Sequence, residues 1–237
     1  MSELLRYDLL DGIATLTLDD GKANVMSVAM LAAIRAALDQ AEADQAVVVL
    51  QGRPGMLSGG FDLTVFKRDP KELFQMLKAG AELTERMLSF PFPVLVICTG
   101  HAIAMGAFLL LSADHRIGTQ AKAKIQANEV QIGLTLPHFA IEVCRQRLAP
   151  AHFNLAAITA LPYDQQQALA AGFLDELTSP EALPDILKRR TEHLRGLHMA
   201  SFAATKLRLR GPALSALRAA IAHDIDDWSQ RFGGEAE

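Results

Sequence analysis

The sequence has little cysteine, no long uninterrupted hydrophobic run and no block of like charges. Its 237 residues include only two cysteines, Cys98 and Cys144, so neither a disulfide framework nor a cysteine metal cluster is expected. The longest apolar stretch, Pro91 to Ala113, is broken by two glycines and a histidine, whereas a bilayer span needs roughly 18 uncharged apolar residues. The start, MSELLRYDLL, lacks the basic flank of a signal peptide. We therefore expect a cytoplasmic protein without a membrane partner.

The charge balance also excludes some partners. There are 23 Lys and Arg against 27 Asp and Glu, which makes the chain mildly acidic and argues against a nucleic-acid partner. His101 and His138 both lie in glycine- or proline-containing loops, but no HExxH or paired Cys/His spacing surrounds them. No metal is therefore expected.

The hydrophobic pattern alternates between strands and helices over most of the chain. It predicts a hairpin around Asp11-Gly12, and then helices and buried strands in turn. The predicted elements are a hairpin over Leu4–Asp19, helices over Ser27–Asp44, Lys71–Leu88 and Met105–Ser112, and strands over Ala46–Leu50, Pro91–Thr99, Arg116–Gly118 and Lys124–Gln126. Only helices are expected after Pro137. The pattern is typical of an α/β fold with largely parallel strands, which we divide into a core (1–185) and a helical C-terminal segment (186–237).

Three loops follow predicted strands and contain glycine: Gly52–Leu63, Gly100–Phe108 and Asn128–Pro137. The adjacent glycines Gly59 and Gly60 let a backbone approach a ligand closely. The second loop leads into a helix, whose free N–H groups can stabilise a negatively charged oxygen. Taken singly, a plain turn is the favoured explanation of the first loop, and the tight packing of small residues is that of the second. The glycine spacing fits neither a phosphate-binding P-loop nor a dinucleotide fingerprint.

Together these motifs resemble the crotonase, or enoyl-CoA hydratase/isomerase, superfamily, from about Leu4 to Asp227. The resemblance implies a spiral ββα core of the ClpP-like type, a coenzyme A thioester as substrate, no further cofactor, and a homotrimer or a dimer of trimers. It also implies an oxyanion hole formed by the backbone N–H groups of Gly59 and Met105. The chain ends soon after Trp228, and this short C-terminus puts in doubt the contacts that relatives make with the nucleotide.

One acidic residue of the family pattern is kept and another is missing. The resemblance places the catalytic glutamate at Glu129, within Asn128-Glu129-Val130-Gln131-Ile132-Gly133, and hydratases of the family carry a second glutamate where this chain has Phe108. Hydration suits two carboxylates, whereas moving a double bond needs one base. The motif is most similar to the 3,2-enoyl-CoA isomerases, so we expect an isomerase. A hydratase, or a non-catalytic acyl-CoA-binding protein, remains an alternative.

The resemblance also suggests which residues bind the substrate. The coenzyme A residues would be Lys22, Ala23, Val25, Gly60, Phe61, Asp62 and Leu63, and the acyl pocket would include Phe66, Phe108 and Pro137. Phe74 and Met76 are further acyl candidates, although apolar side chains on a helix usually belong to the core. The basic cluster of Lys206, Arg208 and Arg210 suits phosphate groups, but a solvated helix face is the default interpretation.

Overall fold

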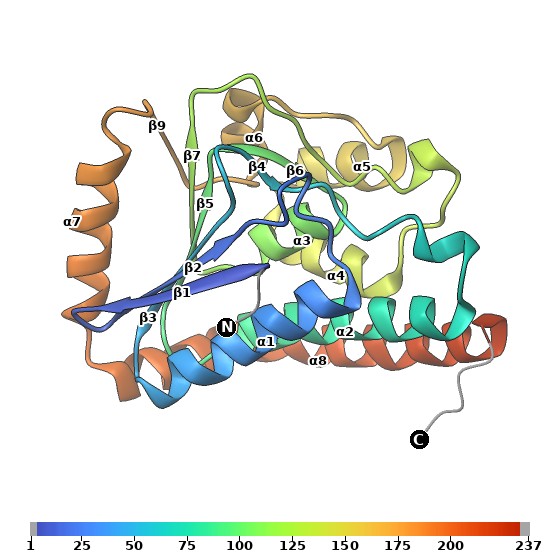
Figure 1. Cartoon of the computed structure of the whole chain (residues 1–237), viewed down its shortest axis with the longest axis horizontal. Helices are drawn as coiled ribbons and strands as arrows, with labels where there is room; N and C mark the ends of the chain where they lie inside the picture. Colours follow the sequence, from blue (N-terminus) through green and yellow to red (C-terminus); the bar gives the residue numbers. More distant parts are fainter. Residues whose placement is uncertain (1–3, 233–237) are drawn as a thin grey trace.

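The computed structural model describes residues 4–232, and it contains two sheets surrounded by helices (Figure 1). The strands are β1 (Leu5–Leu10), β2 (Ile13–Leu18), β3 (Val47–Gln51), β4 (Gly55–Ser58), β5 (Val94–Cys98), β6 (Gly100–Ile103), β7 (His115–Thr119), β8 (Ile125–Gln126) and β9 (Glu176–Thr178). The helices are α1 (Val28–Ala43), η1 (Val65–Lys67), α2 (Pro70–Ser89), α3 (Met105–Leu111), η2 (Val130–Ile132), α4 (His138–Arg147), α5 (Pro150–Thr159), α6 (Gln165–Ala171), α7 (Leu183–Arg195) and α8 (Met199–Phe232).

The larger sheet has six strands in the order β1-β2-β3-β5-β7-β9. Strands β1 and β2 form the predicted antiparallel hairpin, and both turn residues, Asp11 and Gly12, have the positive φ angles that a tight hairpin turn requires. The other neighbouring strands pair in parallel. This confirms the α/β class and the parallel core that the sequence predicts.

The smaller sheet consists of β4, β6 and β8, all parallel. The backbones of Gly55 and Gly100 approach so closely that a Cβ on Gly100 would lie 1.8 Å from the carbonyl carbon of Gly55. Three short strands correct our expectations, since β4 and β6 lie in segments predicted as loops and β9 follows Pro137. They have four or three residues each, so their pairing depends on tertiary contacts rather than on a readable local period.

Helices cover the larger sheet on both faces. Leu183, Ile186 and Leu187 of α7 pack on one face, against a small apolar cluster that includes Val49 and Ile97. The opposite face belongs to the main core. The expected boundary between residues 185 and 186 falls inside α7, so no change of structure marks that point.

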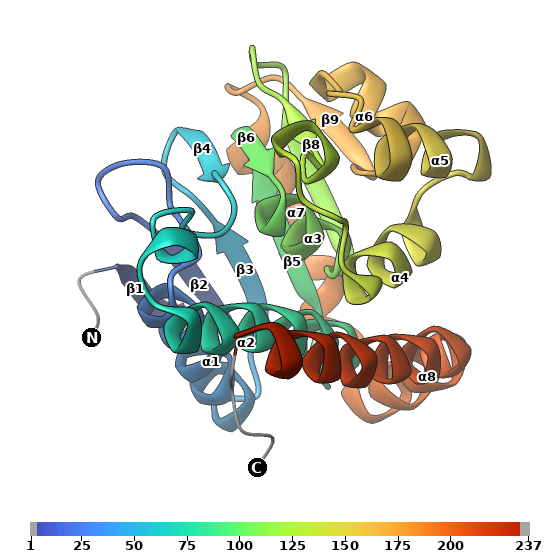
Figure 2. The ribbon, with the colours of Figure 1, turned by 90° about the vertical axis from the view of Figure 1, so that its right-hand side faces the viewer.

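The long helix α8 lies alongside α2, as Figures 1 and 2 both show. Helix α8 continues over 34 residues with Pro212 inside it. Leu214, Leu217 and Trp228 of α8 are buried in the main core. Within residues 4–232, no helix is long and apolar enough to cross a membrane.

Candidate active site

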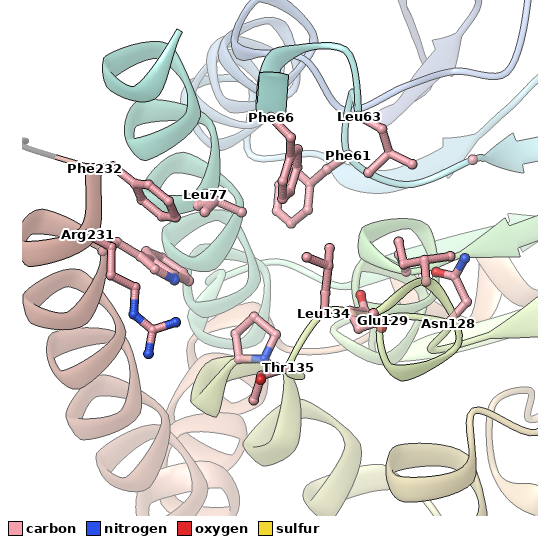
Figure 3. Close-up of a pocket in the computed structure, with 16 residues that line it drawn as sticks. Phe61, Leu63, Phe66, Leu77, Asn128, Glu129, Leu134, Thr135, Arg231 and Phe232 are labelled. Atoms are coloured by element: carbon pink, nitrogen blue, oxygen red, sulfur yellow. The ribbon is translucent and has the colours of Figure 1, made fainter. Parts of the chain in front are cut away.

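A cavity of about 270 Å³ lies between the smaller sheet, α2 and the end of α8 (Figure 3). In Figure 3, Glu129 and Asn128 lie on one side of the view and Arg231 and Phe232 on the other. Most of the wall is apolar, as is usual for a site that excludes water from its ligand. The lining residues are Gly59, Phe61, Leu63, Phe66, Leu77, Ala104, Asn128, Glu129, Ile132, Gly133, Leu134, Thr135, Pro137, Trp228, Arg231 and Phe232.

Glu129 supplies the only carboxylate among the described residues that line this cavity. It precedes the short helix η2, and the residue is only 6% exposed. Its Oε2 atom is buried and has no hydrogen-bond partner within residues 4–232. Burial raises the pKa of Glu129 to about 7, and a hydrogen bond from its own backbone N–H opposes this rise. The carboxylate can therefore both accept and return a proton near neutral pH.

Asn24 fastens the loop before α1 to the glycine-containing loop after β4. It is fully buried with φ 50°, and its amide nitrogen donates to the carbonyl oxygens of Leu18 and Leu57. The Ser58 hydroxyl donates to the Asn24 carbonyl oxygen at 2.7 Å. These contacts hold the two loops together at the cavity.

The hydrogen bonding of this loop corrects one sequence-based assignment. The Gly59 N–H donates to the carbonyl oxygen of Ala23 at 2.7 Å, so it is not free to stabilise an oxyanion. The N–H of Phe61, two residues later, has no acceptor within the described part of the chain, and Phe61 lines the cavity. Which N–H is free depends on the position of the Ala23 carbonyl, which the motif alone does not reveal.

A second free N–H comes from the start of α3. Ala104 lines the cavity and has φ 49° and ψ −119°, a strained conformation for a residue with a side chain. The next residue, Met105, begins the helix, and its N–H has no acceptor among residues 4–232. Gly60 contacts this turn closely, because a Cβ there would lie 2.9 Å from the Ala104 Cβ. The N–H groups of Phe61 and Met105 thus lie on two loops that meet beside the Glu129 cavity.

Comparisons with known proteins identify the family of this chain. The family model for enoyl-CoA hydratase/isomerase matches residues 9–234. The chain belongs to the enoyl-CoA hydratase/isomerase family. A solved structure of a family member from Pseudomonas syringae is 46% identical, with a TM-score of 0.92 over 94% of this chain and 97% of that one.

Two further family members are also similar to this chain. A Mycobacterium tuberculosis protein described as an enoyl-CoA isomerase is 42% identical, with a TM-score of 0.89 over 98% of this chain and 100% of that chain. Another structure of that protein describes it as a probable enoyl-CoA hydratase. A probable enoyl-CoA hydratase from Rhodobacter capsulatus is 30% identical over 85% of this chain and 79% of its own length. Family membership therefore leaves both reactions open.

The structure brings some of the expected family residues to the cavity and places others elsewhere. Those that line it are Gly59, Phe61, Leu63, Phe66, Glu129 and Pro137. The structure does not place the others among the lining residues, namely Lys22, Ala23, Val25, Gly60, Asp62 and Met105. The first three belong to the loop beside the cavity, and Gly60 and Met105 are chain neighbours of residues that line it. The Asp62 carboxylate accepts hydrogen bonds from the backbone and hydroxyl of Thr64, so it stabilises its own turn.

Phe108 does not line the cavity. It is fully buried in the core, where its ring packs edge-to-face on Phe139 with 5.8 Å between centroids. Phe74 and Met76 are likewise core residues of α2. The aromatic residue at position 108 therefore acts through packing rather than as an acyl-binding wall.

Sequence reasoning missed the contribution of α8 to this family site. Trp228, Arg231 and Phe232 line the cavity, and Figure 3 shows Arg231 and Phe232 on the side opposite Glu129. Asn128 was also missed as a separate group, and its Oδ1 atom is buried without a partner in the described residues. A helical period indicates an apolar stripe on α8 but not which loop that stripe will contact.

Proposed function

We propose that this chain isomerises 3-enoyl-CoA to 2-enoyl-CoA, with Glu129 as its single acid–base group. The observation that carries the proposal is a buried carboxylate with a pKa near 7. It is the only acidic group among the described residues that line this largely apolar cavity. A double-bond shift needs one group that removes a proton and returns it. The similarity to a Mycobacterium tuberculosis protein that one of its structures describes as an isomerase supports the same reaction.

In the proposed mechanism the thioester oxygen accepts hydrogen bonds from the N–H groups of Phe61 and Met105. Ionised Glu129 takes a proton from C2, and the electron pair of the broken C–H bond moves toward the thioester carbonyl, which gives a dienolate conjugated with the C3–C4 double bond and with its charge on the thioester oxygen. Protonated Glu129 then delivers the same proton to C4, which leaves the double bond between C2 and C3. Nothing is gained or lost, so substrate and product have equal mass.

The test is to incubate the purified protein separately with 3-enoyl-CoA and 2-enoyl-CoA and to follow absorbance and mass. We expect 3-enoyl-CoA to become 2-enoyl-CoA without a change of mass. Glu129→Gln should lower the rate by about 10²- to 10⁴-fold, as is typical for loss of a general base. The matched control is Glu181→Gln, since Glu181 is exposed on the surface. Unchanged turnover in Glu129→Gln would contradict the assignment.

Hydration of 2-enoyl-CoA is the second candidate, and one observation favours it. The unpartnered Oδ1 of Asn128 lines the same cavity as Glu129, so these two groups are suited to hold a water molecule between them. A gain of one water by 2-enoyl-CoA in the same assay would favour this reaction over isomerisation. Binding of both thioesters without turnover, unaffected by Glu129→Gln, would instead indicate a non-catalytic acyl-CoA-binding protein.

We further propose that the chain assembles as a homotrimer or a dimer of trimers and works in the cytoplasm. Leu155 and Ile158 of α5 are 42% and 66% exposed, which supports an apolar contact with another subunit. Cys98 and Cys144 are buried and unpaired, as expected in a reducing compartment. Light scattering coupled to gel filtration tests the assembly, and a monomer at micromolar concentration would overturn it.

A further inference from the structure

A second cavity, of about 460 Å³, lies at the start of α8. Its lining residues are Asp114, Arg147, Leu197, His198, Ser201, Phe202, Thr205, Lys206, Leu209 and Arg210. The first cavity contacts the other end of α8, at Trp228. At 1.5 Å per residue, Lys206 and Trp228 are separated by roughly 33 Å along the helix. The second cavity is therefore separate from the proposed active site.

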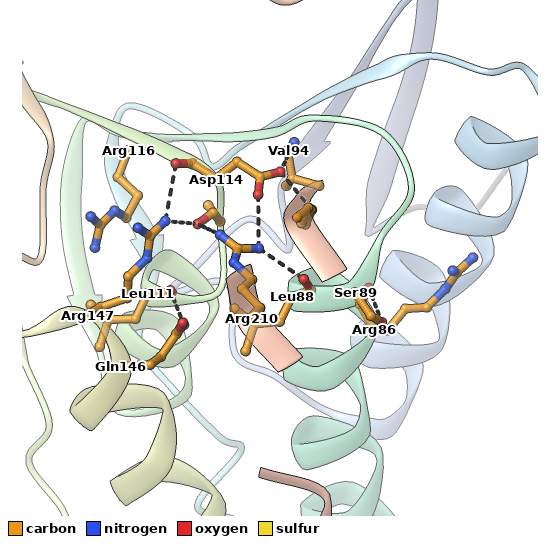
Figure 4. Close-up of polar contacts among 12 residues, drawn as sticks. Arg86, Leu88, Ser89, Val94, Leu111, Asp114, Arg116, Gln146, Arg147 and Arg210 are labelled. Carbon is orange, nitrogen blue, oxygen red and sulfur yellow. Dashed lines mark hydrogen bonds and ion pairs between the residues drawn. The ribbon is translucent and has the colours of Figure 1, made fainter. Parts of the chain in front are cut away.

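One carboxylate, that of Asp114, serves several donors in this second cavity. It accepts from Lys206 Nζ at 2.8 Å and from Arg210 at 2.9 Å, and also from the backbone N–H of Val94 (Figure 4). The neighbouring Arg116 forms a separate ion pair with Asp175. Asp114 thus has two cationic side chains to compensate before Arg147 is considered.

Arg147 has no carboxylate partner within the described residues. Its guanidinium donates to the carbonyl oxygens of Ala113 and Asp114, as Figure 4 shows, while its Nε is buried without an acceptor in residues 4–232. Three cationic side chains, Arg147, Lys206 and Arg210, therefore lie at a cavity that has one carboxylate, that of Asp114. A half-buried guanidinium that contacts only carbonyl oxygens is costly, because these dipoles compensate its charge less well than a carboxylate would.

The pKa shifts agree with this excess of positive charge. Burial, opposed by Asp114 and reinforced by the nearby guanidinium groups, lowers the pKa of Lys206 to about 8. Burial and the charges of Arg116 and Arg210 lower the pKa of Arg147 to about 10. Both cations would be stabilised by a further negative charge in the cavity.

The start of α8 adds hydrogen-bond donors to the same cavity. Its first turn directs the positive end of the dipole of a 34-residue helix toward the cavity, and the Ser201 N–H is capped by the His198 Nδ1 atom. Ser201 and Thr205 place hydroxyl groups on the lining, and His198 lies 2.9 Å from the Ser201 hydroxyl. These hydroxyl groups line the same cavity as the cationic side chains of Arg147 and Lys206.

We propose that this cavity binds a phosphate group, either free or carried by a small phosphomonoester, between Arg147, Lys206 and the first turn of α8. A phosphate dianion matches the two positive charges that Asp114 leaves uncompensated. Its oxygens accept from guanidinium, ammonium and hydroxyl donors together. Leu197 and Phe202 form an apolar wall against which the organic part of an ester would pack.

The experiment measures thermal unfolding and calorimetric binding of the full chain with inorganic phosphate and with phenyl phosphate, at constant ionic strength in chloride. We expect saturable binding and a Tm that rises with ligand concentration, because a ligand of the native state stabilises it. Tighter binding of phenyl phosphate would identify an ester as the preferred form, and equal or weaker binding would identify free phosphate. No saturable binding of either would overturn the proposal.

Arg147→Met should weaken phosphate affinity by about ten- to a hundredfold, as expected for loss of charged hydrogen bonds. The control on the same helix is Arg145→Met, because the Arg145 side chain is 57% exposed and pairs with Glu142. A second variant, Thr205→Glu, introduces a carboxylate from an exposed position. It should raise Tm in phosphate-free buffer and abolish the response to phosphate. Equal phosphate responses in wild type, Arg147→Met and Thr205→Glu would contradict the site.

Discussion

The carboxylate of Asp224 in α8 accepts a hydrogen bond from the backbone N–H of Phe139 at 2.7 Å, and its other oxygen accepts from His138 at 2.9 Å. These N–H groups open α4, which begins after Pro137, a residue without a side-chain oxygen for capping. α8 therefore caps α4. Pro137 and Trp228 both line the candidate active-site cavity, so this contact joins two of its walls.

Removing that cap should weaken both the fold and the site. We expect Asp224→Ala to lower the free energy of unfolding by about 1 to 3 kcal/mol, because the first two N–H groups of α4, one of them buried, lose their acceptor. It should also lower kcat/KM for 3-enoyl-CoA, since the wall formed by α8 is less well held. Urea denaturation and initial rates measure the two effects. Asp226→Ala, an exposed position on the same helix, is the control and should leave both quantities unchanged.

The raised pKa of Glu129 predicts how activity depends on pH. The base is the ionised form, so kcat/KM should rise about tenfold per pH unit below 7 and level off above it. A profile measured from pH 5 to 9 with 3-enoyl-CoA checks this. A plateau that already begins at pH 5 would mean that the carboxylate is more hydrated during catalysis than in the described structure.

The same shift predicts an effect on stability with a defined sign. The pKa of Glu129 rises from 4.5 to about 7 on folding, so the folded state holds the proton more tightly and wild type loses stability as the pH rises through this range. The cost at pH 8 is about 3 kcal/mol. Glu129→Gln removes this cost. The free energy of unfolding of the variant, relative to that of wild type, should therefore be about 2 kcal/mol larger at pH 8 than at pH 5. Glu181→Gln should show no such difference over this range.

Long elements with a clear period could be predicted from the sequence, whereas contacts between distant segments could not. The valine-rich strand β3 and the amphipathic helix α2 follow from local pattern and lie close to their predicted places. The strand β9 has three residues, and its pairing with β7 supplies the information that its own sequence lacks. Likewise the motif around Gly59 indicated a site, but the position of the Ala23 carbonyl decides which N–H remains free.

The end of α8 should limit the length of the acyl chain. Phe232, Trp228 and Leu77 line the cavity, and Figure 3 shows Phe232 on the side away from Glu129. Phe232→Ala shortens this wall, so kcat/KM should rise for a twelve-carbon substrate relative to a six-carbon one. Rates with a series of 3-enoyl-CoA chain lengths test it. Phe202→Ala, at the far end of the same helix, is the control, and an equal change in both variants would contradict the prediction.

Introducing the missing second carboxylate at position 108 should damage the protein rather than create a hydratase. Phe108 is fully buried against Phe139 and does not line the cavity, so Phe108→Glu would place an uncompensated carboxyl group in the core. We expect a loss of about 4 kcal/mol or more of unfolding free energy and no hydration of 2-enoyl-CoA. Phe108→Leu, which stays apolar, should cost roughly 1 to 2 kcal/mol and keep isomerase activity. A stable Phe108→Glu variant that adds water would show instead that the side chain at this position reaches the substrate, and that the apolar residue there separates the two reactions of the family.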